Sequence, residues 1–276
     1  MKAHLRTVFD YFAYFSYAPS FSEIHTFFPK KISAKALKDY LANEVSGGSL
    51  VLLSHNRYFR ASKSDSYTIP QYSIFTRKTI QKDIQRYLDV LMLIPLVRFV
   101  GVTGASAMNG HRIDDDLDLC IVTKKGFMWT TRFLVVCIAK LLGIHTSTGV
   151  CLNLFFDERD LIIPATKRNS YIAHELIQMK PIVDKDFTHK RFFQSNPWIT
   201  QYYPNIRIQL SPKTSRESQA AHNYFFSLIT HIDRWFKLIQ LPIIKRNETA
   251  LFISPHQLWL FKYDFEKKLK RRGLVI

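Results

Sequence analysis

The sequence predicts a mixed α+β protein with a helical C-terminal region. Its 276 residues are 47% hydrophobic with only 9 glycines, which supports two or three packed units and argues against wholesale disorder. Apolar residues recur at helical spacing in some segments and form short continuous runs in others, and the two patterns alternate in the middle of the chain. We divide the chain into residues 1–70, 71–205 and 206–276.

The first 70 residues predict three short helices and a hairpin. Residues 5–16 carry a helical apolar stripe, Ser20 and Glu23 form a capping-box pattern, and Ser33 begins a third helix. A hairpin follows over 49–61. This order is that of a winged helix-turn-helix.

In a winged helix the third helix can enter a major groove. Lys35 and Lys38 on that helix, and Arg57 and Arg60 on the hairpin, are then the candidate phosphate contacts. The alternative is a protein-docking module whose basic side chains are simply solvated.

Residues 71–205 predict the α/β layers, and the C-terminal region predicts two helices separated at Pro242. The expected elements are helix 74–96, strand 99–102, a turn and short helical piece from 103, strand 117–122, helix 127–142, strand 150–156, helix 170–179, and helices 217–240 and 254–271.

An acidic cluster runs directly into the second of these strands. Asp114, Asp115, Asp116 and Asp118 would be costly there without a cation. On a strand Asp116 and Asp118 point to the same side, with their Cα atoms about 6.6 Å apart. This spacing suits two carboxylates that share Mg²⁺ or Mn²⁺. The upstream turn at Gly104 offers backbone N–H groups for phosphate.

This segment resembles the DNA polymerase β-like nucleotidyltransferase superfamily, over roughly residues 75–200. The resemblance implies a nucleotidyltransferase fold, an NTP substrate and Mg²⁺ or Mn²⁺ on Asp116 and Asp118. It also places the nucleotide phosphates at Gly104, Ala105 and Ser106. The overall order is similar to that of uncharacterised bacterial nucleotidyltransferase-domain proteins with an N-terminal winged helix.

Two positions depart from the family pattern. Ala105 stands where the family has serine, and Ser106 follows one residue later. Asn153 occupies the central polar position of strand 150–156, where the family usually has a third carboxylate, and Asp157 lies about 13 Å further along. The chain is therefore either a nucleotidyltransferase whose site is completed by Asn153 or Asp157, or a catalytically degenerate regulator that binds nucleotide or DNA.

One neighbouring group and two other motifs bear on this interpretation. Arg112, between the turn and the aspartates, can contact the triphosphate or face solvent. A dinucleotide-binding turn at Gly104 lacks its further glycines, and the acidic run lacks the spacing of an EF-hand.

The net charge of +17 is spread over all three parts, as +4, +5 and +8. It favours RNA, DNA or another anionic acceptor over a polycationic one, and a protein hydroxyl stays open as the acceptor. The basic end of helix 254–271 leaves contact with an anionic membrane surface open.

Three cysteines within apolar runs predict buried thiols in a reducing compartment, and neither a signal peptide nor a membrane span is expected. We therefore expect a cytoplasmic protein.

Overall fold

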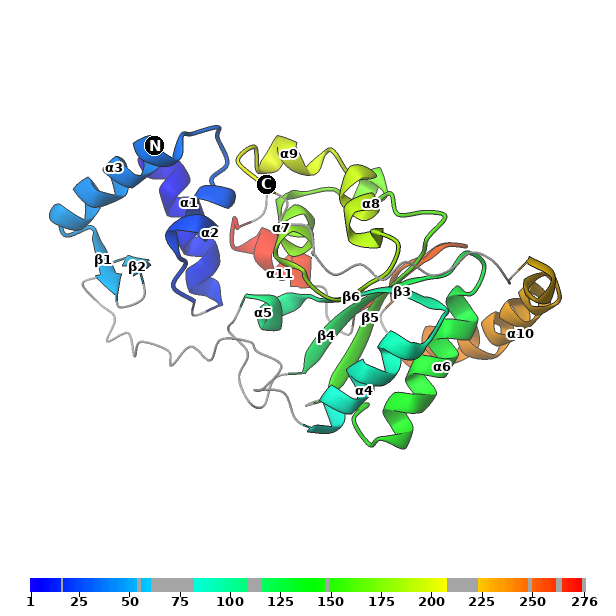
Figure 1. Cartoon of the computed structure of the whole chain (residues 1–276). Coiled ribbons are helices and arrows are strands. Elements are labelled where there is room, and N and C mark those ends of the chain that lie inside the picture. Colours follow the sequence, from blue (N-terminus) through cyan, green and yellow to red (C-terminus); the bar gives the residue numbers. More distant parts are fainter. Residues whose placement is uncertain are drawn as a thin grey trace.

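The computed structural model describes residues 1–15, 17–53, 56–60, 82–108, 116–146, 149–207, 223–247, 250–261 and 265–274. A six-stranded mixed sheet lies at its centre, with helices on both faces and a small N-terminal unit to one side (Figure 1). The mixed α+β class is confirmed.

The N-terminal unit contains the three helices and the hairpin in the predicted order. They are α1 (Lys2–Tyr14), α2 (Phe21–Thr26), α3 (Ala34–Ser46), β1 (Leu50–Leu53) and β2 (Arg57–Arg60). The capping box that begins α2 is formed by Ser20 and Glu23, and the Ser33 hydroxyl accepts the Ala36 N–H at the start of α3. Strands β1 and β2 pair antiparallel.

The remaining elements build the main unit. They are α4 (Lys82–Leu93), β3 (Val97–Val102), α5 (Gly104–Ala107), β4 (Leu117–Thr123), α6 (Met128–Leu141), β5 (Val150–Asp157), the 3₁₀ turn Ala165–Lys167, α7 (Ser170–Gln178), β6 (Lys180–Asp184), α8 (Thr188–Gln194), α9 (Ile199–Tyr202), α10 (Asn223–Asn247), β7 (Ala250–Ile253), β8 (Gln257–Leu260) and α11 (Phe265–Arg271). The strand order is β6-β3-β4-β5-β8-β7, in which β4 and β5 are parallel and the other neighbours antiparallel.

Strand alternation gives the sheet two apolar faces with different coverings. Leu119 and Ile121 of β4 belong to a core with α4, α6 and Ile244 of α10. Cys120 and Val122 belong to a second core, which continues through α7 and α8 into the N-terminal unit. The N-terminal unit therefore packs on the face of the sheet opposite α10.

The C-terminal region differs from the prediction. The expected helix 254–271 is wrong over Gln257–Leu260, because this segment forms β8, pairs with β5 and carries β7 at the sheet edge. Helix α10 also continues through Pro242, because Gln240 before it bonds the Trp129 carbonyl and Ile244 after it is buried. Tertiary packing here outweighs the loss of one helical hydrogen bond.

One buried asparagine joins the N-terminal unit to the main unit. The Asn205 amide donates to the carbonyls of Phe28 and Lys30 at 3.1 and 2.7 Å, and its oxygen accepts the Ile32 N–H at 3.0 Å. The loop between α2 and α3 is thereby fixed to the chain after α9. Burying these backbone groups without Asn205 would leave them unsatisfied.

No helix within the described residues combines the length and the apolar composition that crossing a membrane requires.

We expect Asn205→Ala to lower stability by about 2–3 kcal/mol, because it removes the partner of one buried and two partly buried backbone groups. The thermal midpoint, followed by circular dichroism, should fall by roughly 4–8 °C. Asn43→Ala, on the exposed side of α3, is the matched control and should change stability by no more than about 0.5 kcal/mol. Equal midpoints for the two variants would contradict this role of Asn205.

Candidate metal and nucleotide site

The turn after β3 approaches the start of β4 very closely. Thr103 donates its N–H to the Asp118 carbonyl at 2.9 Å, and Gly104 follows with φ of +66°. A Cβ atom at Gly104 would lie 2.5 Å from Asp118 Oδ2. Both the backbone conformation and the missing side chain therefore require glycine here.

Three possible metal ligands meet beside this turn. One ligand atom each from Asp116, Asp118 and Cys151 lies within 4.8 Å of the other two, and all three residues are half-buried. The predicted meeting of the Asp116 and Asp118 side chains is confirmed, although Asp116 lies one residue before β4. Cys151 lies on β5, which runs parallel to β4. In this pairing Cys151 is opposite Asp118.

Cys151 was missed by the sequence analysis, which treated all three cysteines as buried thiols. Only Cys120 is buried, whereas Cys137 and Cys151 are partly exposed. Cys151 and Asn153 are two residues apart on one strand, so their side chains point to the same face. This spacing could have predicted Cys151 as a site residue only if the strand beside β4 had been known.

The donor set fits a divalent ion. Two carboxylates suit Mg²⁺ or Mn²⁺, which take oxygen ligands. The Cys151 sulfur is a softer donor, and it favours Mn²⁺ or another transition metal over Mg²⁺ at that position. These three residues supply only part of the ligands that such an ion takes, and the remaining ligands also affect which ion binds.

Asn153 lies against the same carboxylate. Its amide donates to Asp118 Oδ1, and its oxygen accepts from Cys151 Sγ at 2.9 Å. A register shift between Leu119 and Cys120 in the β4–β5 pairing accompanies this placement. The position at which a third carboxylate was expected thus holds a neutral amide that orients Asp118.

Asp157 lies at the other end of β5, opposite Thr123, as its spacing predicted. Its carboxylate accepts the Gly126 N–H at 2.7 Å and pairs with Arg159 at 2.6 Å. It fixes the loop before α6 and does not reach the aspartate cluster.

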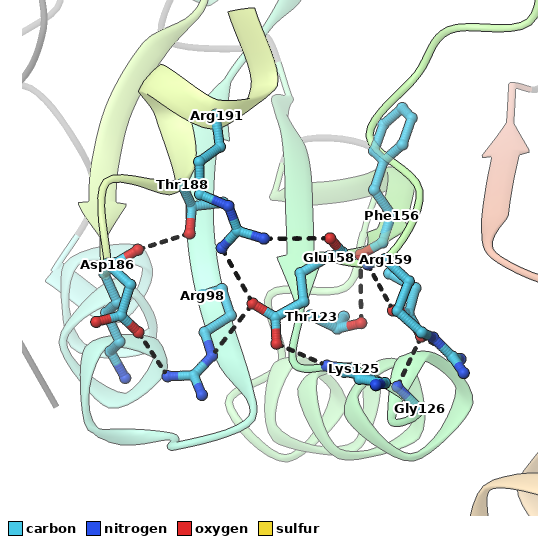
Figure 2. Close-up of polar contacts among 12 residues, drawn as sticks. Arg98, Thr123, Lys125, Gly126, Phe156, Glu158, Arg159, Asp186, Thr188 and Arg191 are labelled. Carbon is cyan, nitrogen blue, oxygen red and sulfur yellow. Dashed lines mark hydrogen bonds and ion pairs between the residues drawn. The ribbon is translucent and has the colours of Figure 1, made fainter. Parts of the chain in front are cut away.

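A second charged cluster also lies at that far end of the sheet (Figure 2). The Glu158 carboxylate accepts the Lys125 N–H at 3.0 Å and pairs with Arg191 at 3.3 Å and with Arg98 at 3.9 Å. Arg98 also pairs with Asp186 at 3.2 Å. Because the charges pair with one another, the cluster joins α8 to β3 and β5 and is a structural feature.

Glu175 of α7 supplies a buried carboxylate at the site turn. It accepts the Gly104 N–H at 2.9 Å and the Gln178 amide at 2.8 Å. Burial raises the pKa of Glu175 to about 7, and these two hydrogen bonds oppose the rise. The predicted phosphate donor, the Gly104 N–H, is therefore already bonded to a carboxylate.

The sequence analysis did not select Glu175. The available signal was an acidic residue on the apolar stripe formed by Ile172, Leu176 and Met179.

The other predicted nucleotide-binding residues lie as follows. Ala105 is half-buried in α5, and the buried Ser106 hydroxyl donates to the Asp116 carbonyl at 3.3 Å. Arg112 lies outside the described residues, as do Asp114 and Asp115. Ser106 thus helps to hold Asp116 in place.

The predicted nucleic-acid contacts divide into two kinds. Lys35 and Lys38 are exposed on α3, and Arg60 is exposed while pairing with Asp10 at 2.6 Å. Arg57 instead donates to the Ala18 carbonyl at 2.7 Å, lies 3.6 Å from a Glu23 oxygen and stacks over Tyr17. Its guanidinium is engaged within the N-terminal unit, whereas Lys35, Lys38 and Arg60 are the exposed candidates for phosphate contact.

Comparisons with protein-family models, with curated proteins and with solved structures give no match to this chain.

Gly104→Ala should be strongly destabilising, because it places a Cβ against Asp118 and strains the backbone. Gly143 is the matched control, since it has φ of +67° and open space around its Cβ position. Gly143→Ala should cost about 1 kcal/mol from backbone strain alone. We expect Gly104→Ala to exceed this by at least about 2 kcal/mol in urea unfolding, and similar losses would contradict the close approach.

Glu175→Gln should change the pH dependence of stability. The raised pKa means that the folded chain keeps a proton between about pH 4.5 and 7 that the unfolded chain releases, so this group destabilises the fold as pH rises through that window. Gln keeps an oxygen acceptor for the Gly104 N–H. The variant should gain up to about 3 kcal/mol over wild type at pH 8 and little at pH 4.5.

Thermal unfolding of both proteins across this pH range measures the difference. Asp39→Asn, on exposed α3, is the control for replacing a carboxyl group by an amide away from the site. A constant difference for Glu175→Gln would argue against a protonated buried carboxyl group.

Proposed function

We propose that the protein is a metal-dependent nucleotidyltransferase, which transfers NMP from an NTP to an acceptor hydroxyl. The observation that carries this proposal is the meeting of Asp116 and Asp118 beside the glycine turn that joins β3 to α5. The resemblance of this segment to the polymerase β-like superfamily supports it.

In this reaction the acceptor oxygen bonds to the α-phosphorus while the bond to the β-phosphate oxygen breaks, and pyrophosphate leaves. A divalent ion bound by Asp116 and Asp118 would neutralise charge on the phosphates. Asn153 and Ser106 hold those two aspartates in place through Asp118 Oδ1 and the Asp116 carbonyl. Asn153 has no basic group, so the acceptor proton must leave to another group or to water.

The charge of the chain bears on the acceptor. A net charge of +17 attracts RNA, DNA or another anionic acceptor and repels polycations. Lys35, Lys38 and Arg60 are the described side chains of the N-terminal unit that we assign to phosphate contact. We therefore propose a nucleic-acid acceptor, with RNA ends as the first candidate.

One contact favours a second candidate, a regulator that binds nucleotide or DNA without catalysis. Asn153 stands where the resemblance implies a carboxylate. Glu175 bonds the Gly104 N–H, so in either candidate a phosphate at that N–H would have to displace the Glu175 carboxyl group. Nucleotide binding without transfer is the behaviour that distinguishes this candidate.

The decisive experiment incubates the purified chain with α-³²P-labelled NTPs, total RNA and either Mg²⁺ or Mn²⁺. We expect label on RNA, with Mn²⁺ the better ion because of Cys151. Asp116→Asn with Asp118→Asn should reduce transfer by at least about a thousandfold while preserving side-chain shape. Asp160→Asn, at a half-buried position after β5 and outside the site, is the control and should leave the rate unchanged.

Transfer that survives the double substitution would overturn the assignment of these aspartates. Retention of labelled NTP by the protein without transfer to RNA would instead select the regulator. In that case, filter binding of DNA should show a salt dependence that becomes shallower when Lys35 and Lys38 are neutralised.

A further inference from the structure

Helix α10 leaves large apolar side chains in water. Trp235, Leu238, Ile239 and Ile243 expose 67%, 65%, 55% and 55% of their surface. Trp235, Ile239 and Ile243 follow one another at four-residue spacing and so form one stripe along the helix, with Leu238 beside it. Contiguous apolar exposure of this kind marks an interaction surface rather than ordinary protein surface.

The stripe continues onto the neighbouring helix. Phe133 of α6 is partly exposed and stacks on Phe236 of α10, with ring centroids 4.4 Å apart. Figure 1 shows α6 and α10 side by side on one side of the sheet. We call the surface formed by Phe133, Trp235, Leu238, Ile239 and Ile243 the α10 face.

Basic side chains border the α10 face. Arg234, Lys245 and Arg246 are exposed, and Lys237 is half-buried. Arg234 and Lys245 are eleven residues apart, so they lie on nearly the same line of the helix.

Residues 232–246 contain a single acid, Asp233, and it is turned toward α6. Its carboxylate accepts the Thr130 N–H at 2.7 Å and the Thr130 hydroxyl at 2.9 Å. The described outer side of α10 is therefore apolar with a positive border.

We propose that the α10 face binds the surface of an anionic lipid bilayer. Its apolar side chains enter the boundary between headgroups and acyl chains, and its basic border contacts lipid phosphates. Trp235 suits this boundary because its ring is apolar while its N–H can meet headgroup oxygens.

The charges favour a membrane over a second copy of this chain. A twofold contact brings the same patch from both copies together, and it would bring the basic border of one copy, with Arg234 and Lys245, toward the basic border of the other. Such like charges repel, whereas anionic lipids neutralise them.

The position of α10 agrees with this attachment. Ile244 packs into the core on one face of the sheet, while the N-terminal unit and α7 pack on the other face. A bilayer on the α10 face leaves the N-terminal unit turned away from the lipid. The proposal does not depend on nucleotidyl transfer.

The test is flotation of the full chain with phosphatidylcholine vesicles and with vesicles of equal parts phosphatidylcholine and phosphatidylglycerol. We expect binding to the anionic vesicles that weakens with salt. Trp235 also reports insertion by fluorescence, because the other tryptophans, Trp129, Trp198 and Trp259, are at most 5% exposed. Its emission should shift to the blue on binding.

Matched variants locate the surface. Trp235→Ser with Ile239→Ser should weaken binding at least about tenfold, and Arg234→Gln with Lys245→Gln should weaken it roughly twentyfold at low salt. Val51→Ser with Leu52→Ser removes two exposed apolar side chains of β1 and should leave binding unchanged.

Failure to float with anionic vesicles would overturn the proposal, as would binding that survives the Trp235 and Ile239 substitutions. A dimer on size-exclusion chromatography that these substitutions dissociate, without vesicle binding, would assign the face to a second copy and also overturn it. Transfer of labelled NMP is measured in a separate assay, so failure of the membrane proposal and failure of the proposed function can be told apart.

Discussion

The close approach of Gly104 to Asp118 is the constraint on which the site depends. Because β3 and β4 pair antiparallel with Val102 opposite Leu119, the chain leaving β3 must turn beside the start of β4. Gly104 permits that turn with a positive φ and no side chain. Asp118 is consequently enclosed by the turn on one side and by the Asn153 amide on the other, and it is held in one orientation before any ion binds.

Helix α7 connects this turn to the N-terminal unit through two consecutive residues. Glu175 accepts the Gly104 N–H, while the His174 ring stacks on Phe27 with centroids 3.6 Å apart and lies 4.1 Å from the Tyr11 ring. Burial lowers the pKa of His174 well below its ordinary value, so the imidazole is neutral in this aromatic contact. The N-terminal unit shares a core with the site-bearing face of the sheet.

The two proposed surfaces use opposite faces of the same sheet. The aspartates and Asn153 lie with α7, whereas α10 covers the other face and presents its apolar stripe outward. The sequence predicts possible membrane contact by the basic C-terminal helix. Some of its basic side chains instead interact with other residues of the same chain. Lys268 and Arg272 lie over the Tyr14 ring, and Lys270 pairs with Glu266.

Local sequence patterns determined much of this protein. The caps at Ser20 and Ser33, the strand run from Leu117, and the alternation that puts Asp116 with Asp118 all act within a few residues, so they could be predicted without a structure. Tertiary structure decided what depends on partners far along the chain. Strand β8 exists because β5 offers an edge. Helix α10 crosses Pro242 because Gln240 before it bonds α6 and Ile244 after it is buried in the core. Cys151 and Glu175 reach the aspartate site from 33 and 57 residues beyond Asp118, and only the folded chain brings them there.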